Sequence, residues 1–107
     1  MFPSFQTKLA GVKFGNCQEA IRKWGHQDIG YYSLEREPDN PHDPNAIGVY
    51  FLHDRLGYQK RSVAEKLAPV MDAGTKLYAR FVRRNQFADD SIVGLTVEII
   101  EDVPVSR

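Results

Sequence analysis

The stretch REPDNPHDPNAIGVYF, residues 36–51, joins a polar, proline-rich loop directly to an apolar, β-branched segment. Pro38, Pro41 and Pro44 recur at every third position, and each proline fixes its own φ and restricts the residue before it. The loop therefore has little conformational entropy left to lose when it binds a ligand. Asp and Asn side chains also fix turns by bonding to nearby backbone groups. The loop is either a stiff connector or a wall that holds carboxylates and amides for a ligand, and ordered loops favour the second interpretation.

Period-two alternation predicts a strand directly after this loop, over residues 46–52, because Ile47, Val49 and Phe51 fall on one face. A turn at residues 53–55 then leads into a short return strand. The same reasoning along the rest of the chain predicts strands over residues 5–14, 29–36, 75–84 and 91–100, with a hairpin loop over residues 85–90.

Two capping boxes predict two short helices. In the first, Asn16 caps the helix with Glu19 as its reciprocal partner, and in the second Ser62 is paired with Glu65. Pro69 removes a backbone donor inside the second segment, so we expect a break or kink there. Five or six strands joined mostly by short turns, with two short helices, predict a mainly β fold, a small OB-like, partly open antiparallel barrel.

The bulk composition limits the function classes. A chain of 107 residues suits one domain over residues 1–107, and 14 basic against 14 acidic residues argue against non-selective coating of nucleic acid, though not against a local basic patch. A single cysteine, Cys17, excludes an intramolecular disulfide and favours a reducing, cytoplasmic location. Neither a signal-peptide pattern nor a membrane-spanning apolar stretch is present. Phosphate-loop and nucleophile signatures are missing, so we expect no enzyme activity and no cofactor.

Two segments resemble the HIRAN domain family: the run LEREPDNPHDPNAIGVYF, and LGYQKRSVAEKLAPVMDAG after it. KLAGVKF near the start is similar to the family's opening strand, and the resemblance covers about residues 8–74. It implies an OB-type barrel with appended helices that binds single-stranded DNA at a free 3′-hydroxyl end. It also implies a setting in DNA repair or replication-fork processing, with other DNA-processing proteins as further partners. The oligomeric state stays open.

The resemblance implies a set of DNA-binding residues: Lys13, Phe14, Asn40, His42, Asp43, Tyr58, Lys60 and Arg61. Asp43 would accept a hydrogen bond from the 3′-hydroxyl and repel an internal phosphate. Lys60 and Arg61 stand where the family has basic residues near backbone phosphate. Two positions depart from the family's pattern, since Gly15 stands where a second aromatic is common and His42 replaces the usual tyrosine. Fewer aromatic side chains imply weaker base stacking.

Two other function classes stay open from the sequence. The zero net charge suits a protein-interaction module that docks a partner without binding DNA. A metal-dependent nuclease could use His42, Asp43, His53 and Asp54, although their spacing fits no known ligand pattern.

Overall fold

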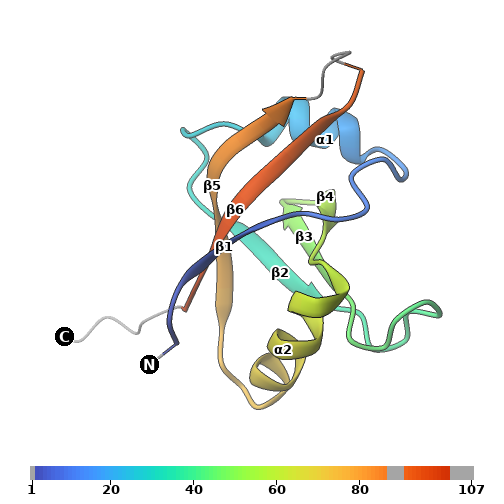
Figure 1. Cartoon of the computed structure of the whole chain (residues 1–107), viewed down its shortest axis with the longest axis vertical. Helices are drawn as coiled ribbons and strands as arrows, with labels where there is room; N and C mark the ends of the chain where they lie inside the picture. The colour runs from blue at the N-terminus through green and yellow to red at the C-terminus, as the bar shows by residue number, and fades with distance from the viewer. Residues whose placement is uncertain (1, 87–90, 102–107) are drawn as a thin grey trace.

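The structure, a computed structural model that describes residues 2–86 and 91–101, consists of one six-stranded antiparallel sheet and two helices (Figure 1). The elements in chain order are β1 (Phe5–Lys8), α1 (Cys17–Trp24), β2 (Tyr32–Arg36), β3 (Ile47–Phe51), β4 (Asp54–Tyr58), α2 (Arg61–Asp72), β5 (Leu77–Gln86) and β6 (Val93–Glu101). Across the sheet the strand order is β1-β6-β5-β2-β3-β4. The predicted mainly β class with two helices is confirmed.

The sheet curls until its two edges meet at one point. Ala10, just beyond β1, exchanges two backbone hydrogen bonds with Tyr58 at the end of β4, with N···O distances of 2.7 and 2.8 Å. Gly57 permits this approach, because a Cβ at residue 57 would lie 2.8 Å from the Ala10 carbonyl oxygen. A single bridge closes the sheet only partly, so the predicted partly open barrel is confirmed.

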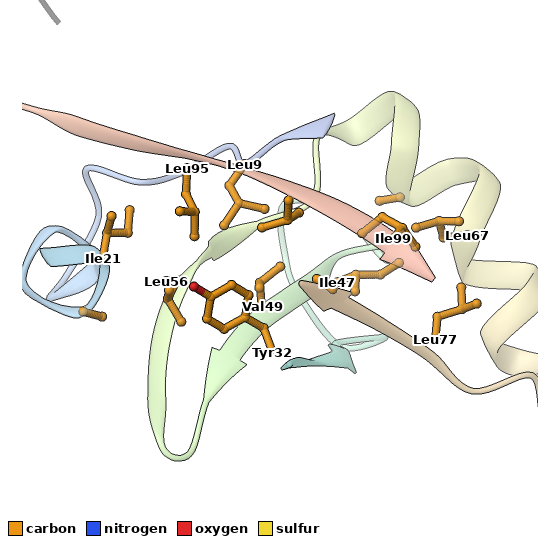
Figure 2. Packing of buried hydrophobic residues seen from close by; sticks show 14 of the residues in the cluster. Leu9, Ile21, Tyr32, Ile47, Val49, Leu56, Leu67, Leu77, Leu95 and Ile99 are labelled. Carbon is orange, nitrogen blue, oxygen red and sulfur yellow. The ribbon is translucent and has the colours of Figure 1, made fainter. Parts of the chain in front are cut away.

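The apolar face of the sheet forms the core. Its fully buried members on β3 and β6 are Ile47, Val49, Leu95, Val97 and Ile99. The two helices add to this core from opposite ends, with Ile21 from α1 and Leu67 from α2 (Figure 2). Burying each such side chain stabilises the fold by about 1.5–3 kcal/mol. Leu56 of β4 is buried in the same core, so β3 and β4, which border the site described below, are held in place.

The first helix lies where it was predicted, but its predicted capping box is wrong. Asn16 occupies the N-cap position, yet its side chain makes no capping hydrogen bond. Gln18 holds the helix instead: its Nε2 donates to the carbonyl oxygens of Val12 (2.8 Å) and Val93 (2.9 Å). Its Oε1 accepts from the Val93 N–H at 2.8 Å. Tertiary bonds to β6 and to the preceding loop therefore replace the local cap.

The second helix begins earlier than predicted. Lys60 is its N-cap and Arg61 its first residue, so the predicted cap at Ser62 is wrong. No side chain caps this end, and no acidic residue lies in the first turn. The positive end of the helix dipole is therefore flanked by two cations rather than by a carboxylate.

The expected break at Pro69 is also absent, because α2 continues through it to Asp72. The carbonyl that loses its partner is that of Glu65, which is solvent-exposed, so water can satisfy it. The helix ends at Asp72 with Ala73 as its C-cap, and Gly74 follows with a φ of 105°, in the region that favours glycine.

The predicted first strand over residues 5–14 is too long. Pairing with β6 stops at Lys8, and Gly11 turns the chain with a φ of 65°. Lys13 and Phe14 therefore lie on a loop before α1, and the Phe14 side chain is 66% exposed. A loop frees both side chains from the alternation that a strand would impose.

Other strand boundaries also differ by a few residues. The strand predicted from residue 29 begins at Tyr32, and the strand predicted over residues 75–84 is Leu77–Gln86, so it includes two residues predicted as hairpin loop. The strands predicted over residues 46–52 and 91–100 are Ile47–Phe51 and Val93–Glu101. Residues 87–90 of that predicted loop lie outside the described residues. Neither helix is long and apolar enough to cross a membrane, as judged over the described residues.

Candidate functional site

The proline-rich loop between β2 and β3 is held by its own polar side chains. Asn40 Oδ1 accepts hydrogen bonds from the backbone N–H groups of His42 (2.9 Å) and Asp43 (3.3 Å). Asp43 Oδ1 accepts one from the Asn45 N–H at 2.9 Å. Asn40 Nδ2 donates to Glu37 Oε1 at 3.0 Å. The loop is therefore stiff before any ligand arrives, and the amide of Asn40 is engaged in holding it.

Arg36 fastens the end of this loop to α2. Its Nη1 donates to the carbonyl oxygens of Pro44 and Ala46, both at 3.1 Å. Its Nε and Nη2 donate to the two carboxylate oxygens of Asp72, at 2.9 and 3.1 Å. The hydrogen bonds of this bidentate pair raise the pKa of Arg36 and lower the pKa of Asp72.

Glu37 ties the loop to β4. Its Oε1 accepts a hydrogen bond from the Tyr58 hydroxyl at 3.0 Å, and that hydroxyl accepts one from Arg55 Nη1 at 2.9 Å. The Arg55 guanidinium also lies 4.9 Å from the centroid of the Tyr58 ring. Burial, followed by the bond to Glu37, raises the pKa of Tyr58. The Tyr58 ring is therefore held in place by a hydroxyl that donates one hydrogen bond and accepts another.

A pocket of about 510 Å³, called the Asp43 pocket below, lies where these groups meet the loop before α1 and the start of α2. Its lining residues are Phe14, Asn40, His42, Asp43, Ala46, Arg55, Tyr58, Gln59 and Arg61. The structure thus brings six of the eight predicted site residues together from distant parts of the sequence. The other two, Lys13 and Lys60, are sequence neighbours of lining residues and do not line the pocket.

Asp43 keeps one carboxylate oxygen available in this pocket. Oδ2 accepts no hydrogen bond from the described residues and lies 3.8 Å from Arg61 Nε. Arg61 Nη2 donates to the His42 carbonyl oxygen at 2.9 Å, which holds the guanidinium beside the loop. The Asp43 side chain is 18% exposed and that of Arg61 is 76% exposed. An ion pair this open contributes about 0–1 kcal/mol, so its main effect is orientation.

Flat side chains and cations surround this carboxylate. Phe14 is largely exposed, which excludes a place in the core, His42 is exposed and Tyr58 is partly buried. Lys60 and Arg61 begin α2, whose positive end attracts anions. The arrangement can stack planar groups, accept one hydrogen bond at Asp43 and hold an anion at the helix start.

Three polar residues of this site were not predicted from the sequence. Glu37 had no predicted role, Arg55 was predicted to lie in a turn, and Gln59 was not singled out. Arg55 belongs to β4 and reaches Tyr58 three residues on. The position of Gln59 between two predicted DNA-binding residues, Tyr58 and Lys60, was the one available signal.

The four predicted metal ligands do not form one site. His42 and Asp43 line the Asp43 pocket, whereas His53 and Asp54 line a separate cavity of about 520 Å³ beside α1. Asp54 Oδ2 there accepts a hydrogen bond from Trp24 Nε1 at 2.7 Å. Within residues 2–86 and 91–101, His, Cys, Asp and Glu form no group of three or more that could hold a metal ion.

Comparisons with known proteins agree with one another. A family profile described as "HIRAN domain" matches residues 3–99. Helicase-like transcription factor of Oryctolagus cuniculus is 46% identical over 41 residues, a segment that covers 37% of this chain and 4% of that protein. The chain therefore aligns with a small fraction of that relative.

Two solved structures share the fold. The crystal structure of the HIRAN domain of human HLTF matches with a TM-score of 0.65 and 19% identity, over 92% of this chain and 74% of that one. A crystal structure of a protein from Lactobacillus plantarum matches with a TM-score of 0.67 and 22% identity, over 94% of this chain and 100% of that one.

Proposed function

The chain belongs to the HIRAN domain family, and we propose that it is a non-enzymatic module that binds single-stranded DNA at a free 3′-hydroxyl end, in the Asp43 pocket. Family membership is consistent with DNA binding in general. Recognition of the 3′ end rests on the pocket itself, and on one observation above all. One Asp43 carboxylate oxygen, to which no described residue donates a hydrogen bond, lies among aromatic and cationic groups.

A carboxylate in a DNA site acts as a selector. Phosphates repel Asp43, so this side chain disfavours the interior of a strand, where every 3′ oxygen is esterified. A terminal 3′-hydroxyl is neutral and donates a hydrogen bond, and Asp43 Oδ2 is an acceptor without a donor among the described residues. Because the other oxygen is bonded to the Asn45 N–H, the carboxylate is already oriented. The terminal hydroxyl completes its hydrogen bonding, whereas a phosphate adds repulsion.

The cations serve the phosphates further inward. Arg61 lies beside Asp43 and is mostly exposed, so it can pair with a phosphate while Asp43 holds the hydroxyl. Lys60 precedes it at the start of α2, where the backbone N–H groups and the helix dipole also favour an anion. Lys13, on the loop before α1, is the third cation of the proposed path.

The aromatic groups hold the last bases. Phe14 presents an exposed ring at the rim, and Tyr58 a ring fixed by Glu37 and Arg55. Each base–aromatic stack contributes about 1–3 kcal/mol and tolerates any base, because every base has a flat face. His42 adds a third planar group from the loop.

The proposal is tested with short oligonucleotides that end in a 3′-hydroxyl or a 3′-phosphate. We expect the wild-type protein to prefer the hydroxyl by about tenfold, the ratio that 1.4 kcal/mol produces. Asp43→Asn keeps an oxygen for the Asn45 N–H but removes the charge, so the preference should fall close to one without loss of folding. Asp39→Asn is the matched control, because Asp39 is an exposed carboxylate of the same loop that does not line the pocket. Equal affinity of the wild-type protein for both ends would refute the proposal.

The same proposal places the chain in DNA repair, recombination or replication-fork processing, where free 3′ ends arise, and inside the cell with other DNA-processing proteins. Pull-down from cell extract, before and after removal of DNA with nuclease, checks this setting. Partners that persist without DNA and absence of oligonucleotide binding at low salt would favour a protein-interaction module instead.

A further inference from the structure

A buried amide without a hydrogen-bond partner among the described residues belongs to the lining of the Asp43 pocket. Over the described part of the chain, four buried side-chain nitrogen or oxygen atoms have no such partner: Arg55 Nε, Gln59 Nε2, Gln59 Oε1 and Arg84 Nε. Two of these four atoms are the amide of Gln59, which lines the Asp43 pocket, whereas Arg55 lines both this pocket and the cavity beside α1. Gln59 is therefore the residue to explain.

Gln59 differs from the two arginines in this set. Arg55 donates from Nη1 to the Tyr58 hydroxyl, and Arg84 donates from Nη2 to the carbonyl oxygens at the end of α1. Neither polar atom of the Gln59 side chain has a partner within residues 2–86 and 91–101, although the residue is only 4% exposed. Buried amides in folded proteins are nearly always hydrogen-bonded, because an unpaired one loses its bonds to water and gains nothing.

Backbone hydrogen bonds hold Gln59 at this position. The Gln59 N–H donates to the Ile47 carbonyl oxygen at 3.0 Å, so the residue is tied to β3. Its neighbour Tyr58 is tied to Ala10 across the barrel closure. Gln59 is therefore held at the pocket wall by bonds that do not involve its amide. A leucine or methionine would satisfy the packing there without an unpaired group.

We propose that the Gln59 amide hydrogen-bonds the edge of the terminal nucleobase when a 3′ end enters the Asp43 pocket; this inference rests on the function proposed above. An amide offers one donor side and one acceptor side, which is the pattern that a base edge presents in reverse. Gln59 lines the pocket while its amide is screened from solvent, so a turn of this side chain toward the pocket brings the amide to an incoming base. A site with a buried, unpaired amide rejects a ligand that lacks the matching groups, because the amide then stays unpaired. Stacking on Phe14 and Tyr58 accepts any flat group, whereas Gln59 requires a hydrogen-bonding edge.

The test is a cycle of two proteins and two ligands. The ligands are identical oligonucleotides that end in thymidine or in its difluorotoluene analogue, which keeps the shape of the base but hydrogen-bonds poorly, each with a 3′-hydroxyl. The proteins are the wild type and Gln59→Met, which keeps the length of the side chain and removes the amide; Gln59→Leu is a second variant. We expect the wild type to bind thymidine about tenfold more tightly than the analogue, and both variants to bind the two ligands equally.

Thermal unfolding separates this role from a structural one. The melting temperature of both variants should equal or exceed that of the wild type, because neither variant buries an unpaired amide. The proposal is overturned if the thymidine preference is the same in wild type and variants. It is also overturned if the variants melt lower with an unchanged preference, which would indicate an amide satisfied inside the fold, for example by a trapped water. Failure of the wild type to bind any oligonucleotide would refute the proposed function, and this inference with it.

Discussion

The two walls of the Asp43 pocket differ in how their polar groups are satisfied. In the proline-rich loop, Asn40, Glu37 and one oxygen of Asp43 are engaged in bonds within the loop and to β4. On the wall formed by the end of β4, Arg55 Nε and the amide of Gln59 have no partner among the described residues. The polar groups of the first wall are thus paired within the fold, whereas the proposed 3′ end would supply the partners missing from the second. A pocket built in this way combines a fixed shape with a chemical requirement on what enters it.

Tyr32 provides a contrast to Gln59, because its buried polar group does have a hydrogen-bond partner. Its hydroxyl donates to the Trp24 carbonyl oxygen at 2.7 Å, and burial raises its pKa to about 12 from 10.0. Because the pKa is higher in the folded state, the stabilisation is fully present below pH 10 and is lost as the pH rises through 12. The expected loss is roughly 2–3 kcal/mol of unfolding free energy, the largest effect predicted here.

Urea unfolding between pH 8 and pH 12 measures this loss. Tyr32→Phe removes the ionisable group, so its stability should fall less steeply above about pH 10 than that of the wild type. Equal slopes in the two proteins would show that Tyr32 does not carry the effect. At neutral pH, Tyr32→Phe should lower stability by about 1 kcal/mol, because it removes a satisfied bond, whereas Gln59→Met should not.

The next largest effect on stability is expected from Arg36, which bonds the proline-rich loop to α2. Arg36→Ala deletes the bonds to the Pro44 and Ala46 carbonyl oxygens together with the Asp72 pair, and should lower the unfolding free energy by about 2 kcal/mol. A looser loop should also reduce the preference for a 3′-hydroxyl over a 3′-phosphate end. Chemical denaturation and the two-ligand binding assay measure these two changes.

Asp72→Ala is the matched control for that variant. It removes the exposed partner of the ion pair but leaves the two carbonyl bonds of Arg36, so it should destabilise the protein much less than Arg36→Ala does. If Asp72→Ala were as destabilising as Arg36→Ala, the bonds to the loop carbonyls would contribute nothing, and the stiffness of the loop would need another source.

The smallest effect concerns the cations at the start of α2. Lys60→Ala should leave stability nearly unchanged, since Lys60 is exposed, and weaken binding of every oligonucleotide alike. For one lost phosphate contact on a single strand, the slope of log affinity against log salt should flatten by about 0.7. Lys66→Ala removes an exposed lysine from inside α2, away from its N-terminal end, and should leave the slope unchanged. If Lys66→Ala changed the salt slope and Lys60→Ala did not, the proposed phosphate contact at Lys60 would be wrong.

Alternation in the sequence was enough to locate the core strands. The apolar residues that the two-residue period placed on one face are buried in both strands, apart from the partly buried Phe51: Ile47 and Val49 in β3, and Val93, Leu95, Val97 and Ile99 in β6. Local sequence signals mispredicted the capping of α1 and a break in α2. Gln18 anchors α1 in place of the predicted Asn16 cap, and α2 continues through Pro69 because the carbonyl without a partner is on an exposed residue.

The residues of the candidate site likewise divide into those that the sequence predicted and those that it did not. The resemblance named six of the residues that line the pocket, because its motifs include three of them in one loop and the other three in two short flanking segments. Arg55 and Gln59 could not be found, since their place in the pocket depends on the closure between Ala10 and Tyr58 and on the irregular pairing of β3 with β4. Whether a buried amide has a partner is decided by such long-range contacts, which no local pattern encodes.

The most direct test of end recognition compares one oligonucleotide in two forms, linear with a free 3′-hydroxyl and ligated into a circle. The two forms share base composition and phosphate backbone and differ in the presence of an end. Equilibrium binding at fixed low salt should favour the linear form by about tenfold or more, because only a free end supplies the hydroxyl that Asp43 accepts. Equal affinity for the circle would contradict the proposal that the Asp43 pocket reads a 3′ end.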